Sequence, residues 1–531
     1  MKYPIGIQTF EHIRQQGYVY VDKSALVYDL ANNGKIYFLS RPRRFGKSLL
    51  LSTLKAYFQG RKDLFKGLAI EELETTWDEY PVFHLDFNGQ NFNQPYILDK
   101  ALEDFVSSAE DVYGKDKFAS TIGNRFKAVL AKAKAKFGRG AVVLIDEYDK
   151  PMLDVLDSDI IIEEGPNKVN LEDYNRNVLK GFYSVFKAAD EHLQFVMLTG
   201  VTKFSQISVF SGLNQPNDIS MTPKYEALCG ITEDELKNYF SEPLSTLAET
   251  YKCTFEEMHR KFKNMYDGYH FSNNMLDIYN PFSVLNAFNS QNLGDFWFSS
   301  GSPTYLVRLM AHFNQNINEM LNEYYQVGQF IDYRADVEQP LPMIYQSGYL
   351  TIKDYDPDMN EYLLGFPNKE VEKGFIAVLA AGYFNSHENP QAWSSKVVRA
   401  MRKGDTELLR KLMTSFLAGI PYTQRRKDNE RELERYFHYT FYLILRMIGI
   451  YTIFTEKHQS EGRVDCVVET PSYIYIFEFK LDGTAKDALD QINSRGYARE
   501  YESDPRKLFK IGCNFSSKTG TINDWMVEDK P

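Results

Sequence analysis

Three residues near the C-terminal end of the chain have the types and spacing that phosphodiester hydrolysis needs. Asp465 stands in one strand-like run, and Glu478 and Lys480 lie two positions apart in the next, residues 473–480. Carboxylates can hold Mg²⁺ or Mn²⁺, and a lysine can orient or help deprotonate an attacking water. We therefore expect Asp465 and Glu478 to bind the metal and Lys480 to act on the water. A salt-bridged strand face exposed to solvent has the same Glu and Lys spacing, so both interpretations stay open.

The elements that position these residues are expected in the order helix, three strands, helix and strand. Their expected ranges are 430–447, 450–455, 464–469, 473–479, 485–501 and 508–513. Side chains alternate across a strand, so Glu478 and Lys480 should share one face of the sheet, with Asp465 on the neighbouring strand. Glu434 on the preceding helix and Gln491 on the following helix are further candidates for this site.

A second motif, Gly46-Lys47-Ser48, lies near the N-terminal end of the chain. A phosphate-binding loop needs backbone N–H groups at a helix N-terminus, a lysine that reaches the outer phosphates, and a hydroxyl for Mg²⁺. Gly46, Lys47 and Ser48 supply these groups. The consensus places a first glycine at position 41, where this chain has Arg41 followed by Pro42. Pro42 lacks an N–H donor, so the opening of the loop should differ from the standard form.

The basic residues of this loop, Arg41, Arg43 and Arg44, allow three interpretations. They could contact phosphate, reach a neighbouring subunit of a homo-oligomer, or form an exposed positive loop. The sequence alone does not separate these interpretations.

Asp146-Glu147 directly follows the apolar run 141–145, as expected at the carboxyl end of a buried parallel strand. We expect Asp146 to hold the water shell of Mg²⁺ and Glu147 to polarise the water that attacks ATP. The alternative is a buried strand that ends in two solvated carboxylates. Another apolar run, 194–198, ends at Thr199, which is interpreted either as a γ-phosphate sensor or as a helix or turn cap.

Alternating strand and helix patterns in the N-terminal part indicate a doubly wound α/β sheet. The strand-like runs are 36–39, 82–86, 141–145 and 194–198. From about residue 231 helical patterns dominate, with a short strand pair near 347–352 and 361–366. The charged stretch from Arg425 is expected to be a surface linker, and contact with a phosphate backbone is the alternative. We therefore predict a P-loop ATPase domain at 1–230, a mainly helical lid and connecting region at 231–425, and a nuclease-like domain at 426–531.

The 531 residues carry a formal net charge of −11, and the sequence pI is near 5.5. This negative field repels nucleic acid, so any DNA site must be a local basic patch. The four cysteines have no paired spacing, which predicts neither a zinc site nor a disulfide framework and fits the cytoplasm. The first residues lack the apolar core of a secretory signal, and His438, Arg446 and Gly449 interrupt the apolar stretch 436–454. No membrane association is therefore expected.

Several motifs, taken together, resemble one family. They are Val21-Asp22-Lys23-Ser24, Arg-Pro-Arg-Arg-Phe-Gly-Lys-Ser at 41–48, Leu-Ile-Asp-Glu-Tyr-Asp-Lys-Pro at 144–151, Leu-Thr-Gly-Val-Thr-Lys-Phe at 198–204, Tyr-Asp-Gly-Tyr-His-Phe at 266–271, and Glu-Phe-Lys at 478–480 with the downstream Gln491-Ile492. Over essentially its full length, the chain resembles bacterial AAA-ATPase-like proteins that end in a PD-(D/E)XK nuclease-superfamily domain.

The resemblance implies an α/β fold with a P-loop ATPase domain on a parallel sheet, a helical middle region and a C-terminal PD-(D/E)XK-like domain. It also implies ATP and Mg²⁺ as cofactors. The residues carried over are Lys47, Ser48, Asp146 and Glu147 for the nucleotide, and Asp465, Glu478 and Lys480 for the nuclease-like site.

Both motif sets in one chain favour an ATP-gated nuclease that acts on DNA. The acidic charge favours an alternative, a nucleotide-switched nucleic-acid or protein-binding module with an inactive nuclease fold. A third interpretation is an ATPase whose C-terminal domain is purely structural.

Overall fold

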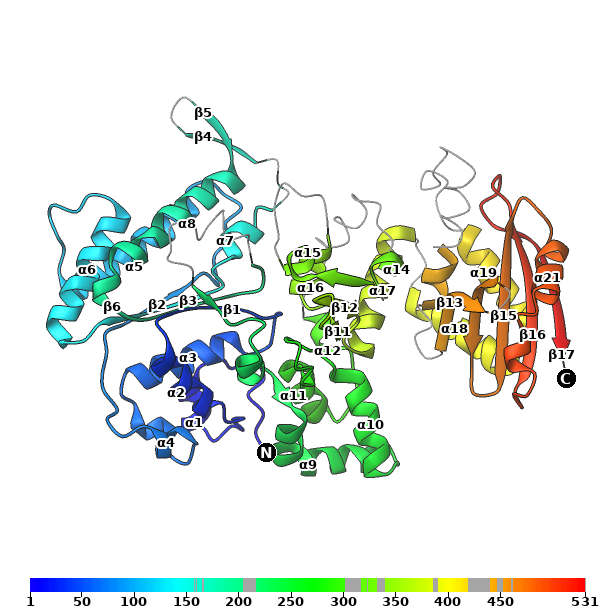
Figure 1. Ribbon diagram of the computed structural model, residues 1–531, viewed down its shortest axis with the longest axis horizontal. Coiled ribbons are helices and arrows are strands. Elements are labelled where there is room, and N and C mark those ends of the chain that lie inside the picture. Colours follow the sequence, from blue (N-terminus) through cyan, green and yellow to red (C-terminus); the bar gives the residue numbers. More distant parts are fainter. Residues whose placement is uncertain are drawn as a thin grey trace. The chain divides into compact units, whose positions relative to one another are not determined.

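The computed structural model describes residues 1–156, 158, 160–164, 167–203, 216–300, 317–321, 323–331, 340–384, 390–418, 440–446, 452–459 and 462–530 (Figure 1). These residues form two compact units, one up to Val371 and one from Glu372 onward. The predicted three-part division stays a prediction, and its linker around Arg425 lies outside the described residues. No helix within the described ranges is both long enough and apolar enough to cross a membrane.

A five-stranded parallel sheet organises the first unit and includes all four of the predicted strands. Its members are β1 (Ile36–Ser40), β2 (Val82–Asp86), β3 (Ala141–Asp146), β6 (Leu193–Gly200) and β7 (Asn217–Asp218), in the order β2-β3-β6-β1-β7. β3 is buried along its whole length, as a strand covered on both faces must be. β6 separates β1 from β3, so the carboxyl ends of these three strands meet at one edge of the sheet.

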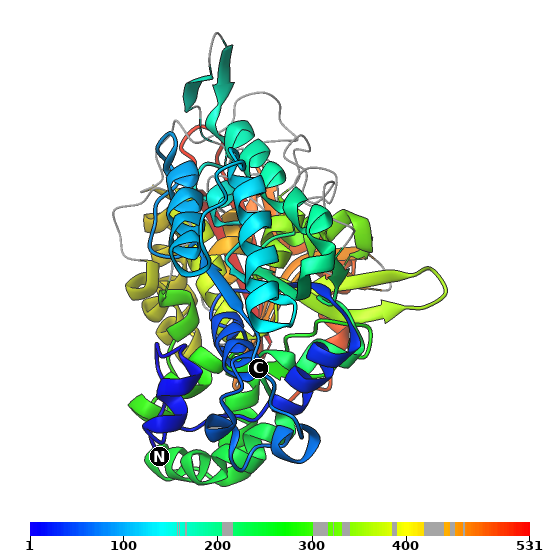
Figure 2. The same ribbon diagram turned by 90° about the vertical axis from the view of Figure 1, so that its left-hand side faces the viewer.

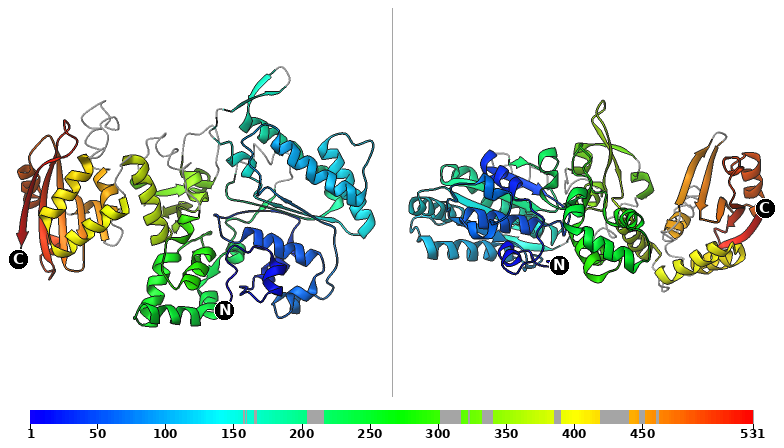
Figure 3. Two further views of the ribbon diagram at one scale, coloured as in Figure 1. Left: turned by 180° about the vertical axis from the view of Figure 1, so that it is seen from behind. Right: turned by 90° about the horizontal axis from the view of Figure 1, so that it is seen from below.

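Helices cover both faces of this sheet, which confirms the doubly wound α/β arrangement (Figures 1 and 3). One face carries α1 (Phe10–Gln15), α2 (Ser24–Asn33) and α3 (Lys47–Phe58), and the other carries α5 (Ile97–Tyr113), α6 (Ile122–Phe137) and α8 (Leu171–Ala188). The short elements are η1 (Lys62–Phe65), α4 (Ile70–Leu73), α7 (Lys150–Leu153), η2 (Asp190–His192) and η3 (Pro223–Leu228). A hairpin of β4 (Ile161–Glu164) and β5 (Asn167–Asn170) projects from the unit (Figure 2).

The remainder of the first unit is mainly helical, as the sequence predicted. Thr232 and Thr254 each close a capping box at the start of a long helix, and Phe262 stacks on Phe288 with 4.8 Å between ring centroids. The predicted strand pair belongs to a small antiparallel sheet in the order β10-β12-β11, although its first strand begins at Thr351 and not near residue 347. The bounds are β8 (Ile231–Thr232), α9 (Glu233–Thr250), α10 (Phe255–Tyr266), β9 (Ile278–Tyr279), α11 (Pro281–Ser290), α12 (Phe296–Ser299), α14 (Ile317–Met320), β10 (Tyr324–Gln326), α15 (Val327–Ile331), α16 (Leu341–Gln346), β11 (Thr351–Asp356) and β12 (Glu361–Gly365).

The second unit is built on a mixed sheet in the order β13-β14-β15-β16-β17, in which β15 and β16 run parallel. α21 lies on one face, and α18 and α19 lie on the other (Figure 3). The bounds are α17 (Lys369–Phe384), which starts in the first unit, α18 (Pro390–Lys403), α19 (Thr406–Ala418), β13 (Thr452–Gln459), β14 (Gly462–Glu469), β15 (Tyr473–Leu481), α21 (Ala485–Ser494), η5 (Arg499–Tyr501), β16 (Lys507–Phe515) and β17 (Ile522–Lys530).

The predicted order of strands around Glu478 is confirmed, with two differences. The helix expected over 485–501 ends at Ser494, and Gly496 follows in a left-handed conformation with φ 64°. β17 was not predicted. The helix expected over 430–447 is helical at residues 440–446, and its other residues lie outside the described ranges.

Candidate functional site

The loop between β1 and α3 leaves open space at the N-terminus of α3. Gly46 has a φ of 96°, a left-handed conformation that glycine adopts without strain. A Cβ atom at Gly46 would meet no heavy atom within 4 Å. The first backbone N–H groups of a helix have no partner inside the helix and readily bind anions. This end of α3, with Ser48 in its first turn, therefore fits the phosphate group that the sequence predicts.

Lys47, the first residue of α3, is only 6% exposed. Its Nζ donates hydrogen bonds to the carbonyl oxygens of Arg41 at 2.9 Å and Pro42 at 3.0 Å. Burial lowers the pKa of Lys47, and the nearby carboxylates of Asp146 and Asp149 oppose that shift. The loop therefore holds its own ammonium group in place by wrapping carbonyl oxygens around it.

The carboxyl ends of β3 and β6 bring Asp146 and Thr199 into contact. Asp146 is 1% exposed, and its Oδ1 accepts a hydrogen bond from Thr199 Oγ1 at 2.7 Å. Asp146 is therefore not the solvated carboxylate of the alternative interpretation. Glu147 follows with a φ of 50°, which is strained for a residue other than glycine, and burial raises its pKa. The predicted catalytic groups of the nucleotide site thus lie at the edge where β1, β6 and β3 end.

Asp149 belongs to the same edge and was not predicted. It is 1% exposed, and its Oδ2 accepts hydrogen bonds from Thr202 N at 2.6 Å, Thr202 Oγ1 at 2.7 Å and Val201 N at 3.0 Å. These bonds join the segment after β3 to the segment after β6. The sequence did contain a signal for this residue, because Asp149 is the third carboxylate in Asp-Glu-Tyr-Asp, at the end of the buried strand.

Arg41 does not stand in an exposed loop, whereas Arg43 and Arg44 are exposed. The Arg41 side chain is 1% exposed, and its guanidinium carbon lies 4.1 Å from the centroid of the Phe271 ring. It donates to the carbonyl oxygens of Ser220 at 2.7 Å and of Ser40 at 2.9 Å. Its contacts therefore support the loop from within the protein and do not present the charge to a ligand or a neighbouring subunit.

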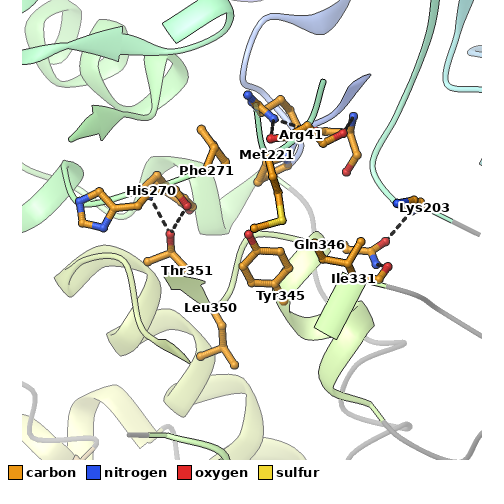
Figure 4. A pocket seen from close by; sticks show the side chains of 14 residues that line it. Arg41, Lys203, Met221, His270, Phe271, Ile331, Tyr345, Gln346, Leu350 and Thr351 are labelled. Carbon is orange, nitrogen blue, oxygen red and sulfur yellow. Dashed lines mark hydrogen bonds between the residues drawn. The ribbon is translucent and has the colours of Figure 1, made fainter. Parts of the chain in front are cut away.

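A cavity of about 40 Å³ lies beside Arg41 (Figure 4). Its lining is mostly apolar and includes Phe271, Met221 and Tyr345. Gln346 on the same wall already accepts a hydrogen bond from Lys203 N at 2.5 Å. A volume of this size holds a few water molecules and is too small for a nucleoside.

The C-terminal sheet brings Asp465, Glu478 and Lys480 together, as the sequence predicts. β14 and β15 are antiparallel neighbours, with Cys466 opposite Phe477. Asp465 Oδ2 accepts a hydrogen bond from the backbone N–H of Phe479 at 2.8 Å, so its carboxylate reaches across to β15. Lys480 Nζ lies 4.0 Å from Glu478 Oε1, on the same sheet face.

Glu478 is buried, which contradicts the alternative of a solvent-facing salt bridge. It is 2% exposed, and its Oε1 accepts a hydrogen bond from Gln491 Nε2. Oε2 has no hydrogen-bond partner among the described residues. Burial raises the pKa of Glu478 well above its usual range, and the neighbouring Asp465 carboxylate raises it further.

Gln491 on α21 joins the two charged residues of β15. Its Oε1 accepts a hydrogen bond from Lys480 Nζ at 2.6 Å while its amide nitrogen donates to Glu478. The suggestion that Gln491 completes the site therefore agrees with the geometry, whereas Glu434 lies outside the described residues.

The donor set fits a hard divalent cation. Asp465 and Glu478 offer carboxylate oxygens, and the unpartnered Oε2 of Glu478 is the kind of buried atom that a cation satisfies. Over the described ranges, no group of three or more His, Cys, Asp or Glu side chains is arranged to hold a metal. A cation here would therefore depend on these two carboxylates and on ligands outside that set, such as water.

Comparison with known proteins agrees with the two types of domain that the sequence predicts. Residues 4–210 match the family described as predicted AAA-ATPase, and residues 432–525 match the PD-(D/E)XK nuclease superfamily. A protein of Azotobacter chroococcum mcd 1, described as an uncharacterized protein in the vnfD 5' region, is 32% identical over 538 residues and covers 99% of each chain.

Among solved structures, a DNA replication initiation factor aligns over 83% of this chain and 98% of its own. The identity is 11% and the TM-score is 0.22, so this alignment supports no conclusion about fold or function. The Azotobacter relative, which aligns over 99% of both chains, and the two family matches identify the family. The chain belongs to the family of predicted AAA-ATPase-like proteins that carry a C-terminal PD-(D/E)XK nuclease-superfamily domain.

Proposed function

We propose that the chain binds and hydrolyses ATP at the loop between β1 and α3, and that its C-terminal unit is a metal-dependent DNA nuclease gated by the nucleotide. In the nucleotide site, Gly46 and Lys47 contact the phosphates. Ser48 and Asp146 would hold Mg²⁺, Glu147 would orient the attacking water, and Thr199, which donates a hydrogen bond to Asp146, would sense the γ-phosphate.

One observation carries the nuclease half of this proposal, namely the buried carboxylate of Glu478. An unpartnered buried carboxylate oxygen is costly unless a proton or a cation satisfies it. A Mg²⁺ or Mn²⁺ ion held by Asp465 and Glu478 would do so. When bound, such a cation would lower the pKa of a water molecule and neutralise charge on the phosphodiester.

Lys480 has a defined position in this proposal. Gln491 holds its ammonium group by one amide atom and holds Glu478 by the other. The side chain of Lys480 is about one-third exposed, so it can reach a water or a phosphate oxygen from outside. Its role is to orient that group next to the two carboxylates.

The deciding experiment measures cleavage of plasmid, linear and single-stranded DNA with Mg²⁺ or Mn²⁺, in the presence and absence of ATP. Glu478→Gln should abolish cleavage. Asp529→Asn is the matched control, because Asp529 is a carboxylate of the same sheet that pairs with Lys507 at 2.7 Å. Lys47→Ala should remove any dependence on ATP. Wild-type protein that binds ATP but leaves every DNA intact would rule out the nuclease.

The charge of the chain supports a second candidate, a nucleotide-switched binding module with an inactive nuclease fold. A net charge of −11 opposes association with DNA. This candidate predicts that the wild type cleaves no DNA. It also predicts that Asp465→Ala binds its nucleic-acid or protein partner as tightly as the wild type does. Loss of a wild-type cleavage activity in Asp465→Ala would exclude it.

The proposal also includes the cellular compartment and the oligomeric state of the protein. All four cysteines are free thiols, which supports a cytoplasmic protein. Arg43 and Arg44 are exposed beside the nucleotide loop, where they could reach a second copy of the chain. Sedimentation of the wild type and of an Arg43→Ala, Arg44→Ala double variant, each with ATP, tests whether a homo-oligomer forms through them.

A further inference from the structure

The nucleotide loop is held by an indole group from a distant part of the first unit. Trp297 in α12 is 5% exposed, and its Nε1 donates a hydrogen bond to the carbonyl oxygen of Arg43 at 2.9 Å. Since the peptide bond is planar and trans, this bond also makes the N–H of Arg44 point away from Trp297. Arg44 has a φ of 66°, a conformation that persists in a residue other than glycine only where the surroundings impose it. The indole therefore fixes a peptide plane just before Gly46 and Lys47.

Trp297 is itself anchored by a buried carboxylate. Glu370 is 1% exposed, and its Oε1 accepts a hydrogen bond from the backbone N–H of Trp297 at 2.6 Å. Its Oε2 accepts a hydrogen bond from Ser283 Oγ at 2.7 Å. Both carboxylate oxygens of Glu370 therefore join α17 to α11 and α12. Glu370 and Trp297 are not among the residues of the nucleotide or nuclease-like sites described above.

Glu370 lies in the first turn of α17, and this turn is tied to its surroundings by a second residue. The Oδ1 of Asn368 accepts a hydrogen bond from Val371 N at 3.1 Å, and its Nδ2 donates to the carbonyl oxygen of Asp267 at 3.0 Å. Two residues after Glu370, within the same helix, the second unit begins. A short chain of hydrogen bonds thus runs from the nucleotide loop, through Trp297 and Glu370, to the start of α17.

We propose that Trp297 and Glu370 are positioning residues of the nucleotide site, which hold the loop in its ATP-binding shape and tie it to the first turn of α17. The proposal rests on ATP binding at this loop. A loop that is already ordered loses less entropy when it binds its ligand, so losing this support should weaken ATP binding. Because binding couplings are reciprocal, ATP should in turn alter the stability of the first turn of α17.

The principal test compares Trp297→Phe with Trp393→Phe. The control removes the same indole N–H, because Trp393 Nε1 donates to the carbonyl oxygen of Leu412 at 3.2 Å within the second unit. Loss of one such bond at the loop should raise the dissociation constant of a fluorescent ATP analogue about two- to tenfold. The control should bind as tightly as the wild type. Equal affinity in the wild type and in a folded Trp297→Phe would overturn the proposal.

Variants of Glu370 provide a test that does not require changing the indole. Glu370→Gln keeps an oxygen that can accept from Trp297 N, whereas Glu370→Leu has none. Affinity for the analogue should therefore fall in the order wild type, Glu370→Gln, Glu370→Leu. A Glu370→Gln variant as weak as Glu370→Leu would show that packing, and not this hydrogen bond, maintains the loop.

Hydrogen exchange separates failure of this proposal from failure of ATP binding. Without nucleotide, Trp297→Phe should speed exchange of the amides at 43–46 relative to Trp393→Phe. With ATP, exchange at 369–372 should change in the wild type and not in Trp297→Phe. If the wild type binds no ATP, the proposed ATPase fails, and unchanged exchange at 43–46 independently refutes the positioning role.

Discussion

Arg41 occupies the position at which the phosphate-loop consensus has glycine, so restoring the consensus is an informative perturbation. Arg41 is fully enclosed, and its guanidinium group donates to the carbonyl oxygens of Ser40, Ser220 and Tyr225 at 2.9, 2.7 and 3.4 Å. It also lies on the Phe271 ring. Arg41→Gly would leave those carbonyl oxygens without their donor and open a void beside the loop.

The expected loss of stability follows from these contacts. The two shorter bonds involve a charged donor, and bonds of that type contribute about 1.5–3 kcal/mol each. Burial disfavours the charged guanidinium and lowers the pKa of Arg41, which offsets part of this gain. Arg41→Gly leaves the carbonyl oxygens of Ser40 and Ser220 without this donor, at a cost of about 1–3 kcal/mol each, or about 2–6 kcal/mol together. We expect Arg41→Gly to lose that amount of unfolding free energy, and Arg41→Met, which keeps an apolar stem, to lose less.

Urea unfolding followed by circular dichroism measures the unfolding free energy. Titration with a fluorescent ATP analogue measures the affinity of the nucleotide site. Arg41→Gly should be destabilised and should not bind ATP more tightly than the wild type. Arg43→Ala is the control, because Arg43 is exposed and its substitution should change stability by less than about 0.5 kcal/mol. A consensus variant that is as stable as the wild type, or that binds ATP better, would refute a supporting role for Arg41.

Three further predictions test other parts of the chain. Burial raises the pKa of Asp267 from 3.8 to about 7, so near neutral pH the folded protein keeps a proton that the unfolded chain releases. The unfolding free energy should therefore fall by about 4 kcal/mol as the pH rises from about 4 to 7. Asp267→Asn should be more stable than the wild type by a margin that grows from pH 5 to 8 in urea unfolding; a constant margin would contradict this. Gln491→Leu removes the bridge to Glu478 and should weaken Mn²⁺ binding about 10- to 100-fold by calorimetry, and unchanged affinity would argue against a metal site. Thr199→Val leaves Asp146 without its hydroxyl donor and should lower kcat for ATP hydrolysis about tenfold with the ATP affinity retained; an unchanged kcat would remove Thr199 from the mechanism.

Several elements could be predicted because local residue patterns decide them. β3 contains an unbroken run of apolar residues at 141–145, which is typical of a strand covered on both faces. Glu478 and Lys480 share a face because side chains alternate along any strand, and their strand pairs with the one carrying Asp465. Periodicity therefore predicted which side chains meet, although it did not reveal that Glu478 is buried.

The remaining features depend on residues far apart in the sequence. Arg41 looks like an exposed charge until Ser220, Tyr225 and Phe271, about 180 to 230 positions later, enclose it. β17 was missed because its sequence, Ile-Asn-Asp-Trp-Met-Val-Glu-Asp-Lys, does not alternate apolar and polar residues in the way that marks a half-buried strand. Its Glu528 pairs with Lys510 at 2.6 Å across to β16, and a contact of this kind has no local signature.

The support of the nucleotide loop by residues near 297 and 370 has a consequence for inheritance. On the proposal that Trp297 and Glu370 position this loop, substitutions in that distant region should alter nucleotide binding, and the two parts of the chain should change together. A gene fragment cut after residue 230 would encode the recognisable motifs without Trp297 and Glu370. Recombination at that point should therefore yield proteins with damaged nucleotide sites.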